Sequence, residues 1–135
     1  MAEASKPLPS PTDVTQPFCQ GCSAGVLRLR RCSHCGRVRG PSRIVCECGQ
    51  ADHGWIDASG RGQIFSYTVV HRAPDPAFRN DLPYVVAVVA LEEGPHLLAN
   101  VIGCQPQQVS IGLEVEAVFE TVAPDIGVAK FRPRV

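Results

Sequence analysis

Apolar and polar positions alternate along much of the second half of the chain, and this pattern predicts β-strands. Over residues 113–120, apolar side chains alternate mainly with glutamate, as in a strand with one buried face. Residues 63–71 are rich in β-branched and aromatic side chains and predict a long first strand. Two further apolar runs, at 84–91 and 96–102, flank a glycine-containing turn and predict a hairpin. A fifth, short strand is expected at 128–132.

Five strands in this part of the chain predict a small closed barrel of the oligonucleotide/oligosaccharide-binding (OB) type. Closure removes the sheet edges that would otherwise promote aggregation. A β-sandwich is the alternative, although five strands are few for one. Between the first two strands, residues 72–83 contain three prolines and predict an irregular surface loop. The fold class is therefore expected to be mostly β.

Four of the seven cysteines occur in two close pairs, each followed by glycine: Cys32 with Cys35, and Cys46 with Cys48. Glycine can adopt the positive φ that lets backbone N–H groups turn toward metal-bound sulfurs. Ten residues separate the pairs, and this spacing predicts a tetrahedral, structural Zn²⁺ site with four thiolate ligands. The short segment that holds these cysteines, a zinc ribbon, cannot bury enough apolar surface by itself. Metal binding would therefore supply much of its folding free energy.

Other ligand sets stay open at this stage, because the second pair is separated by one residue instead of the usual two. Cys19 and Cys22 form a pair of the usual spacing, and nine residues separate it from Cys32. Serine rather than glycine follows Cys22. Either cysteine could replace a ligand of the short pair formed by Cys46 and Cys48, and a chain without metal is the third alternative.

The N-terminal residues 1–17 contain four prolines and lack the basic start and apolar run of an export signal. They predict a disordered or loosely attached arm. No apolar stretch of the sequence approaches the ~20 residues that span a bilayer. We therefore expect a cytoplasmic protein without membrane contact, in a compartment where thiols stay reduced and available for metal.

Composition and charge refine this picture. With 135 residues, of which 44% are hydrophobic, the chain can form one small core with a metal-bound appendage. We expect the arm at 1–17, the ribbon segment at 18–58 and the barrel at 59–135. Six arginines stand against one acid in residues 18–50, so the ribbon is basic. A nucleic-acid-binding module is nevertheless the less favoured reading, because the barrel is rich in acids and only 6% of residues are aromatic.

Several motifs occur in a fixed order between about residues 16 and 133. They are Leu29-Arg-Arg-Cys32-Ser-His-Cys35-Gly, Cys46-Glu-Cys48-Gly, Trp55, Ser59-Gly-Arg-Gly62, Tyr67-Thr-Val-Val-His71, Pro83-Tyr84-Val-Val-Ala and Ile111-Gly112-Leu-Glu-Val. In this order they resemble the acyl-CoA-associated zinc-ribbon/OB-fold family, small accessory proteins of thiolase-like enzymes, acyltransferases and sterol side-chain aldolases.

The resemblance implies a helical N-terminal piece, a rubredoxin-like zinc ribbon and an OB barrel, without chemistry of its own. It further implies that the chain is an accessory subunit, docked on a thiolase-like enzyme or aldolase in an α2β2 assembly. A CoA thioester would bind at a site shared with the enzyme. The resemblance favours a role in the breakdown of steroids or other lipids. The alternative is a stand-alone acyl-CoA-binding protein whose arginines meet the phosphates of CoA.

Three residues are candidates for contact with a partner or ligand. His71 ends the first predicted strand, Phe78 lies in the proline-rich loop, and Tyr84 begins the next strand. Aromatic side chains are favoured where one surface buries another. The alternatives are a solvated surface histidine for His71 and ordinary core packing for Phe78 and Tyr84. No catalytic residue is predicted. Cys104 follows Gly103 at a strand end, with no histidine placed beside it by any motif, and is expected to be a buried or half-buried apolar side chain.

Overall fold

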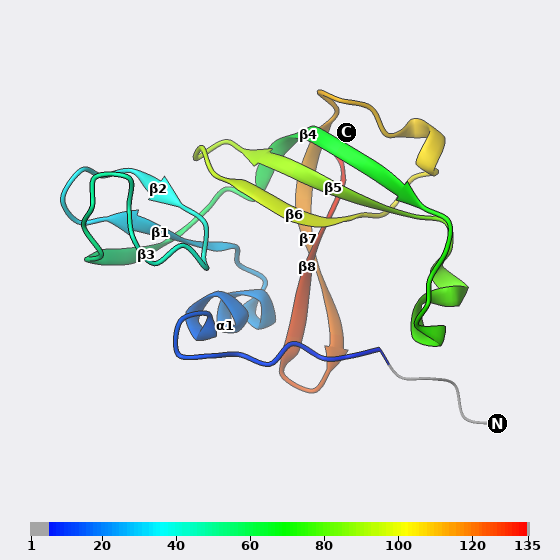
Figure 1. Cartoon of the computed structure of the whole chain (residues 1–135), viewed down its shortest axis with the longest axis horizontal. Helices are drawn as coiled ribbons and strands as arrows, with labels where there is room; N and C mark the ends of the chain where they lie inside the picture. Colours follow the sequence, from blue (N-terminus) through cyan, green and yellow to red (C-terminus); the bar gives the residue numbers. More distant parts are fainter. Residues whose placement is uncertain (1–5, 135) are drawn as a thin grey trace.

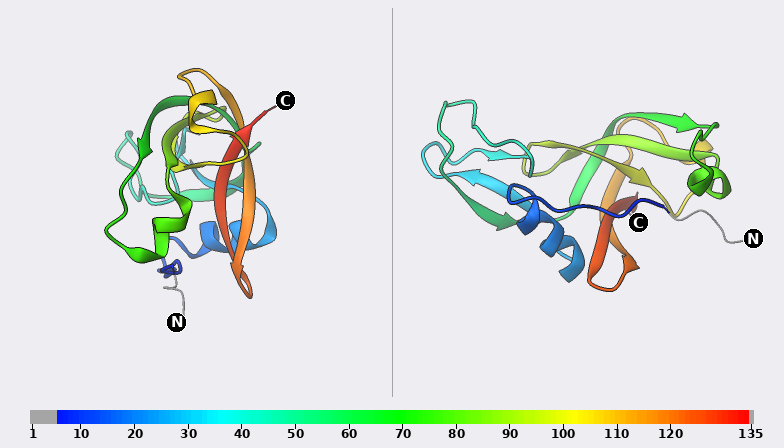
Figure 2. Two further views of the ribbon diagram at one scale, coloured as in Figure 1. Left: turned by 90° about the vertical axis from the view of Figure 1, so that its right-hand side faces the viewer. Right: turned by 60° about the horizontal axis from the view of Figure 1, so that its bottom comes forward.

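The computed structural model describes residues 6–134. A three-stranded ribbon sheet lies beside a closed barrel, with one α-helix between them and below (Figures 1 and 2). Residues 1–5 of the predicted N-terminal arm lie outside the described part. From residue 6 to residue 12 the arm has no regular structure and runs beneath the barrel toward the helix, and Lys6 forms an ion pair with Asp81.

Helix α1 spans Gln16–Ala24 and confirms the expected helical N-terminal piece. Pro17 suits its first turn, because the missing N–H would lack an intrahelical partner there in any case. Gly25 ends the helix with a φ of 79°, a backbone conformation that residues with a Cβ atom rarely adopt. The helix contacts the barrel strand β8 and begins two residues inside the predicted arm.

The ribbon sheet consists of β1 (Arg28–Cys32), β2 (Val38–Arg39) and β3 (His53–Asp57). These strands are antiparallel, in the order β2-β1-β3. Both cysteine pairs lie at a strand end or in the connections of this small sheet. The first pair closes the turn between β1 and β2, and the second lies in the long loop between β2 and β3.

The predicted five-stranded closed barrel is confirmed. Its strands pair in the order β4-β5-β6-β8-β7, and β4 closes on β7. The pair β6 and β8 is parallel, at Val101 and Phe131. The bounds are β4 (Arg61–Val70), β5 (Tyr84–Leu91), β6 (His96–Val101), β7 (Glu114–Ala123) and β8 (Ile126–Pro133).

Two details differ from the sequence-based expectations. Strands β7 and β8 are longer than predicted, because Ala123 pairs with Ile126 and only Pro124 and Asp125 remain in the turn. Asp125 makes this possible by adopting a φ of 61°. The proline-rich loop is also more regular than expected. It contains the 3₁₀ helix η1 (Pro76–Asp81), whose start is capped by the Asp75 carboxylate. A second 3₁₀ helix, η2, spans Pro106–Gln108.

The hydrophobic core fills the barrel and reaches into the ribbon. Alternate residues of β5 point inward, as the burial pattern of that strand shows. The buried cluster also includes Leu27 and Leu29, which are 2% and 0% exposed and come from the start of the ribbon. Two leucines therefore anchor the ribbon in the core of the barrel. The division of the chain at residues 17 and 58 stays a prediction.

The described residues 6–134 contain no helix that is long and apolar enough to cross a membrane.

Candidate functional site

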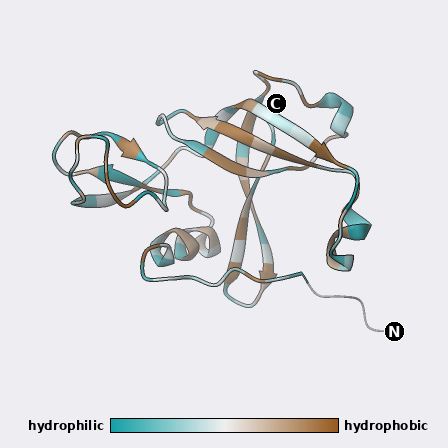
Figure 3. Ribbon diagram, in the orientation of Figure 1, coloured by the Kyte–Doolittle hydropathy of each residue, from teal (hydrophilic) through white to brown (hydrophobic). Residues whose placement is uncertain are grey.

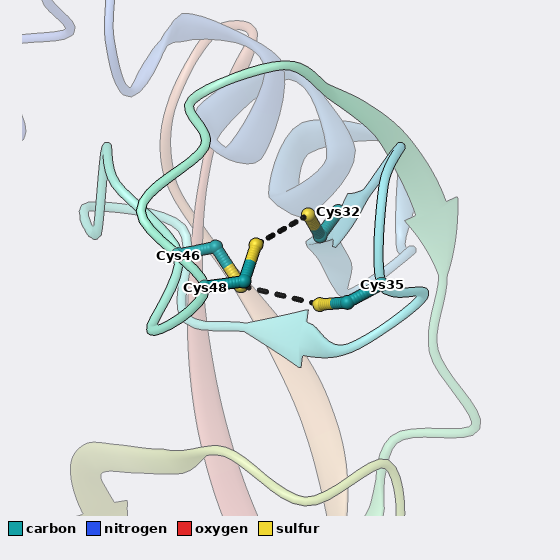
Figure 4. Close-up of side chains that lie close together, drawn as sticks. All are labelled: Cys32, Cys35, Cys46 and Cys48. Atoms are coloured by element: carbon teal, nitrogen blue, oxygen red, sulfur yellow. Dashed lines mark hydrogen bonds between the residues drawn. The ribbon is translucent and has the colours of Figure 1, made fainter.

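The four paired cysteines meet at one end of the ribbon (Figure 4). Their sulfur atoms all lie within 4.8 Å of one another. The Sγ atoms of Cys32 and Cys48 are 3.6 Å apart, and those of Cys35 and Cys46 are 3.5 Å apart. Each contact joins a cysteine of the first pair to one of the second, so the cluster ties the two loops of the ribbon together.

This arrangement suits a tetrahedral metal ion. Thiolates at the usual zinc distance of ~2.3 Å place neighbouring sulfurs about 3.8 Å apart, close to the separations found here. Among the described residues, the cluster draws on neither Cys19 nor Cys22, which lie on α1. The geometry thus brings together the four cysteines of the favoured ligand set, and these four could hold a metal ion.

A glycine follows each cysteine pair and allows the chain to turn tightly. Gly36 and Gly49 adopt φ values of 77° and 90°. The N–H of Gly36 donates to the carbonyl of Cys32 at 3.0 Å, and the N–H of Gly49 donates to the carbonyl of Cys46 at 2.9 Å. The short second pair therefore forms a knuckle of its own in spite of the missing residue.

Backbone N–H groups favour the thiolate form of two of these cysteines. The N–H groups of Cys35 and His34 lower the pKa of Cys32 to about 6. The N–H of Cys48 lowers the pKa of Cys46 in the same way. For Cys48, the N–H of Gln50 acts downward, but burial and the three neighbouring sulfurs outweigh it and raise the pKa to about 11. Four thiols so close together do not all ionise easily, because neighbouring thiolates repel one another. A divalent cation would offset that repulsion.

Two of the three remaining cysteines, Cys22 and Cys104, are shielded from water. Cys22 is a buried residue of α1, and burial, with a smaller contribution from Cys19, raises its pKa to about 11. Burial also raises the pKa of Cys104, which is half-buried as expected. No hydrogen bond within residues 6–134 joins Cys104 to a histidine, the partner that nucleophilic catalysis would require.

A cavity of about 590 Å³ opens between η1 and the barrel. Phe78 and Tyr84, two of the three predicted contact residues, line it, with their ring centroids 6.4 Å apart. Val86, Ile102 and Val128 add apolar surface, and the ion pair of Lys130 and Glu120 lies beside them. The third predicted residue, His71, is exposed at the end of β4 and does not line this cavity.

A second feature, which the sequence analysis did not anticipate, is an apolar outer face on strands β4, β5 and β6. We call this the outer apolar face and define it by Phe65, Val86, Val88 and Leu98. Leu98 is 68% exposed and Phe65 is 56% exposed. Leu98 lies directly opposite Val88, and Phe65 stacks on His96 with ring centroids 4.5 Å apart. Figure 3 shows β5 and β6 as predominantly hydrophobic.

The signal for this face was present in strand β5. Its sequence, Tyr-Val-Val-Ala-Val-Val-Ala-Leu, is apolar at inward and outward positions alike. A strand with this composition is usually covered on both faces. Strand β7, in contrast, carries glutamates between its inward side chains.

Fold and cluster together define a class of protein: a cysteine-rich ribbon joined to an OB barrel. Comparison with known proteins supports the same conclusion. A family model described as "ChsH2, C-terminal OB-fold domain" matches residues 55–120. A DUF35 domain-containing scaffold protein of Methanocaldococcus jannaschii is 41% identical over 106 residues, which cover 77% of this chain and 72% of that protein. The chain belongs to the DUF35/ChsH2 OB-fold family, and the resemblance found in the sequence is confirmed.

Among solved structures, the chain is similar to one described as the Ltp2-ChsH2(DUF35) aldolase. The TM-score is 0.83 at 34% sequence identity, and the match covers 94% of this chain and 99% of that chain.

Two longer relatives contain a region similar to this chain. They are a probable enoyl-CoA hydratase alpha subunit of Thermomonospora curvata, 39% identical over 110 residues, and a 3-oxo-4,17-pregnadiene-20-carboxyl-CoA hydratase alpha subunit of Mycobacterium tuberculosis, 35% identical over 111 residues. These matches cover 81% and 82% of this chain, but only 34% and 35% of the two relatives. The chain thus spans about a third of their length.

Proposed function

We propose that this chain is a non-catalytic accessory subunit that docks on a thiolase-like enzyme or aldolase acting on acyl-CoA substrates. The observation that carries this proposal is the similarity to the Ltp2-ChsH2(DUF35) aldolase chain along nearly the whole length of both proteins. The complex would be an α2β2 assembly in the cytoplasm, with a dimeric enzyme at its centre and one ribbon-and-barrel chain on each side.

The names of the longer relatives support the substrate class. Both are called alpha subunits of hydratases that act on CoA thioesters, and one of those thioesters is a steroid derivative. We therefore propose acyl-CoA derivatives of sterols or other lipids as the substrates of the complex.

The outer apolar face supports a docking role. Isolated apolar side chains are common on protein surfaces, but here they follow one another across neighbouring strands. Covering Leu98 and Phe65 with a partner would remove a substantial apolar area from water. We propose this face as part of the contact with the enzyme.

The metal of the ribbon is proposed to be Zn²⁺ with a structural role, bound by Cys32, Cys35, Cys46 and Cys48. Four sulfur ligands in a compact, closed set are typical of structural zinc. The ion would hold together two loops that contribute few apolar side chains to the core. His71, Phe78 and Tyr84 stay proposals for contact with the partner or the ligand.

One observation favours a second candidate, a stand-alone acyl-CoA-binding protein. The cavity beside η1 has a volume of about 590 Å³, within the range of ~300–1,000 Å³ typical of small-molecule sites. Calorimetry of the isolated chain with acyl-CoA esters separates the two candidates. Heat of binding without any enzyme present would favour the second.

The accessory-subunit proposal is tested by affinity purification of the tagged chain from its own host at moderate salt, followed by mass spectrometry. Recovery of a thiolase-like enzyme or aldolase in near-equal amount is the expected result. Recovery of nucleic-acid-binding proteins, or of the tagged chain alone, would contradict the proposal.

A further inference from the structure

Two arginines of the ribbon are buried side by side. Arg30 and Arg39 are 4% and 5% exposed, and they lie directly opposite each other in the pairing of β1 with β2. Like charges in facing positions destabilise a pair of strands, and a buried cation is costly without a counter-charge. This pair thus needs a physical explanation.

Neither arginine forms an ion pair with a carboxylate anywhere in residues 6–134. Arg30 donates to the carbonyls of Pro41 and Val14, at 2.7 Å and 2.5 Å. Its guanidinium also contacts His53 Nε2 at 2.8 Å and lies 4.5 Å from the ring centroid of Trp55. All of these partners can be neutral, so the positive charge of Arg30 is solvated by dipoles but not balanced.

Arg39 is bonded to both sides of the second cysteine pair. Its guanidinium donates to the carbonyls of Arg43 and Ile44, at 2.7 Å and 2.8 Å, which precede that pair in the chain. It also donates to the carbonyl of Ala51 at 3.1 Å, which follows it. One side chain therefore closes the loop that carries Cys46 and Cys48. The same guanidinium keeps one nitrogen, Nη1, buried without a hydrogen-bond partner.

We propose that Arg39 is the positioning residue of the second cysteine pair, and that Arg30 and Arg39 together are the counter-charge of the metal centre. Four thiolates carry −4 and a divalent ion carries +2, which leaves −2 on the loaded site. The two buried guanidinium groups carry +2, which equals in size the charge left on the loaded site. The inference rests on the zinc site proposed above and is independent of any enzyme partner.

The arrangement also accounts for the unusual spacing of the second pair. A knuckle with one residue between its cysteines has fewer backbone groups to hold its shape. Arg39 supplies three hydrogen bonds to the flanking chain and so fixes where Cys46 and Cys48 lie. Outer groups that orient metal ligands typically change metal affinity by about 10- to 100-fold when removed.

The test measures Co²⁺ and Zn²⁺ affinity by absorption spectroscopy and chelator competition on the full chain. Arg39→Gln removes the positive charge and the guanidinium N–H donors. Arg39→Lys keeps the charge but cannot bridge the two sides of the loop. The matched control is Arg31→Gln, because Arg31 is a neighbouring ribbon arginine that is exposed and forms no side-chain hydrogen bond or ion pair within residues 6–134. Arg39→Gln is expected to weaken metal binding by about 10- to 100-fold. Arg39→Lys is expected to change the Co²⁺ spectrum, and the control to match the wild type.

Each outcome decides between the two proposals. Metal affinities of both Arg39 variants equal to that of Arg31→Gln would overturn the inference while leaving the zinc site intact. Failure of the wild-type chain to bind metal would overturn the zinc site itself. Should Arg39→Gln fail to fold, as seen by circular dichroism, Arg39→Lys carries the test, and a Co²⁺ spectrum and affinity like those of the wild type would reject the inference.

Discussion

The Sγ atoms of Cys35 and Cys46 lie 3.5 Å apart, although the two residues belong to different loops of the ribbon. The loops that they join contribute few apolar side chains to the core, and Ile44 and Val45 of the second loop are half exposed. Stability of the ribbon should therefore depend on what the sulfurs bind.

We expect one divalent metal ion per chain, measured by elemental analysis of the purified protein. Removal of the ion with a chelator, or the change Cys46→Ser, should lower the melting temperature by about 10 °C or more, because metal binding supplies folding free energy. Cys19→Ser is the control and should leave the metal content unchanged, since Cys19 lies outside the cluster. Equal metal loss in both variants would point to a ligand set that recruits Cys19.

Leu29→Ala should destabilise the whole protein and not the ribbon alone. Leu29 is fully buried in a core that it shares with the barrel, so truncation should cost about 2–5 kcal/mol. Trp55 is the single tryptophan and reports on the ribbon by fluorescence, while circular dichroism follows the strands of the barrel. Both signals should shift together in urea. Leu8→Ala, at a 48% exposed position, should have little effect. Separate transitions would mean that ribbon and barrel unfold independently.

Gly127→Ala should loosen the contact between α1 and β8. A Cβ atom at this position would meet the backbone carbonyl of Cys22, which cannot move away without shifting the helix. We expect a loss of roughly 1–3 kcal/mol in chemical denaturation, the usual cost of overpacking. Gly54→Ala is the matched control, because a Cβ there meets nothing within 4 Å and Gly54 lacks a positive φ. A stable Gly127→Ala variant would show that the helix can shift freely.

Leu98→Glu should prevent docking on the partner enzyme without unfolding the chain. The side chain is 68% exposed, so a carboxylate there remains solvated in the free protein but would be buried in a complex. Ile111→Glu, at a 72% exposed position outside the outer apolar face, is the control. Co-purification with the enzyme should be lost in the first variant and kept in the second, at unchanged melting temperatures. Retention of the enzyme by Leu98→Glu would exclude this face from the interface.

Stability should fall in alkaline solution because of Cys22. Burial raises its pKa from 9.0 to about 11 in the fold, so the thiol stays neutral there while the unfolded chain begins to ionise. The contribution of Cys22 to stability is complete below about pH 9 and is lost as the pH rises toward about 11. The loss should approach roughly 2 kcal/mol in urea titrations of the metal-loaded protein. Cys22→Ala should show a flatter dependence on pH over this interval, and an unchanged slope would contradict the assignment.

Much of the barrel could be predicted because its strands carry local signals. The alternation at 113–120 and the hairpin signal at 92–95 depend on neighbouring residues only, and both appear in the structure. The predicted positions of the strand ends were less accurate. The turn between β7 and β8 is shorter than the sequence suggested, because Asp125 tolerates a positive φ that the pattern of residues does not reveal.

The buried arginines show the opposite case. The sequence marks the ribbon as basic without showing which of its six arginines face water. Arg28 is partly buried, and Arg31, Arg37 and Arg43 are exposed. Arg30 and Arg39 are not, because the pairing of β1 with β2 turns both toward the loop of the second cysteine pair. Side chains alternate between the two faces of a strand, so Arg30 and Cys32 are expected on the same face of β1.

By itself, the sequence determined the local elements: the strands with a repeat of two residues, the tight turns at cysteine-glycine pairs, and the order of ribbon and barrel. Each follows from backbone preferences and side-chain alternation over a few residues. The tertiary structure decided which cysteines share one centre, how Phe78 and Tyr84 come to line one cavity, and why two arginines are buried. These features join residues from separate strands and loops, and such contacts exist only once the chain has folded.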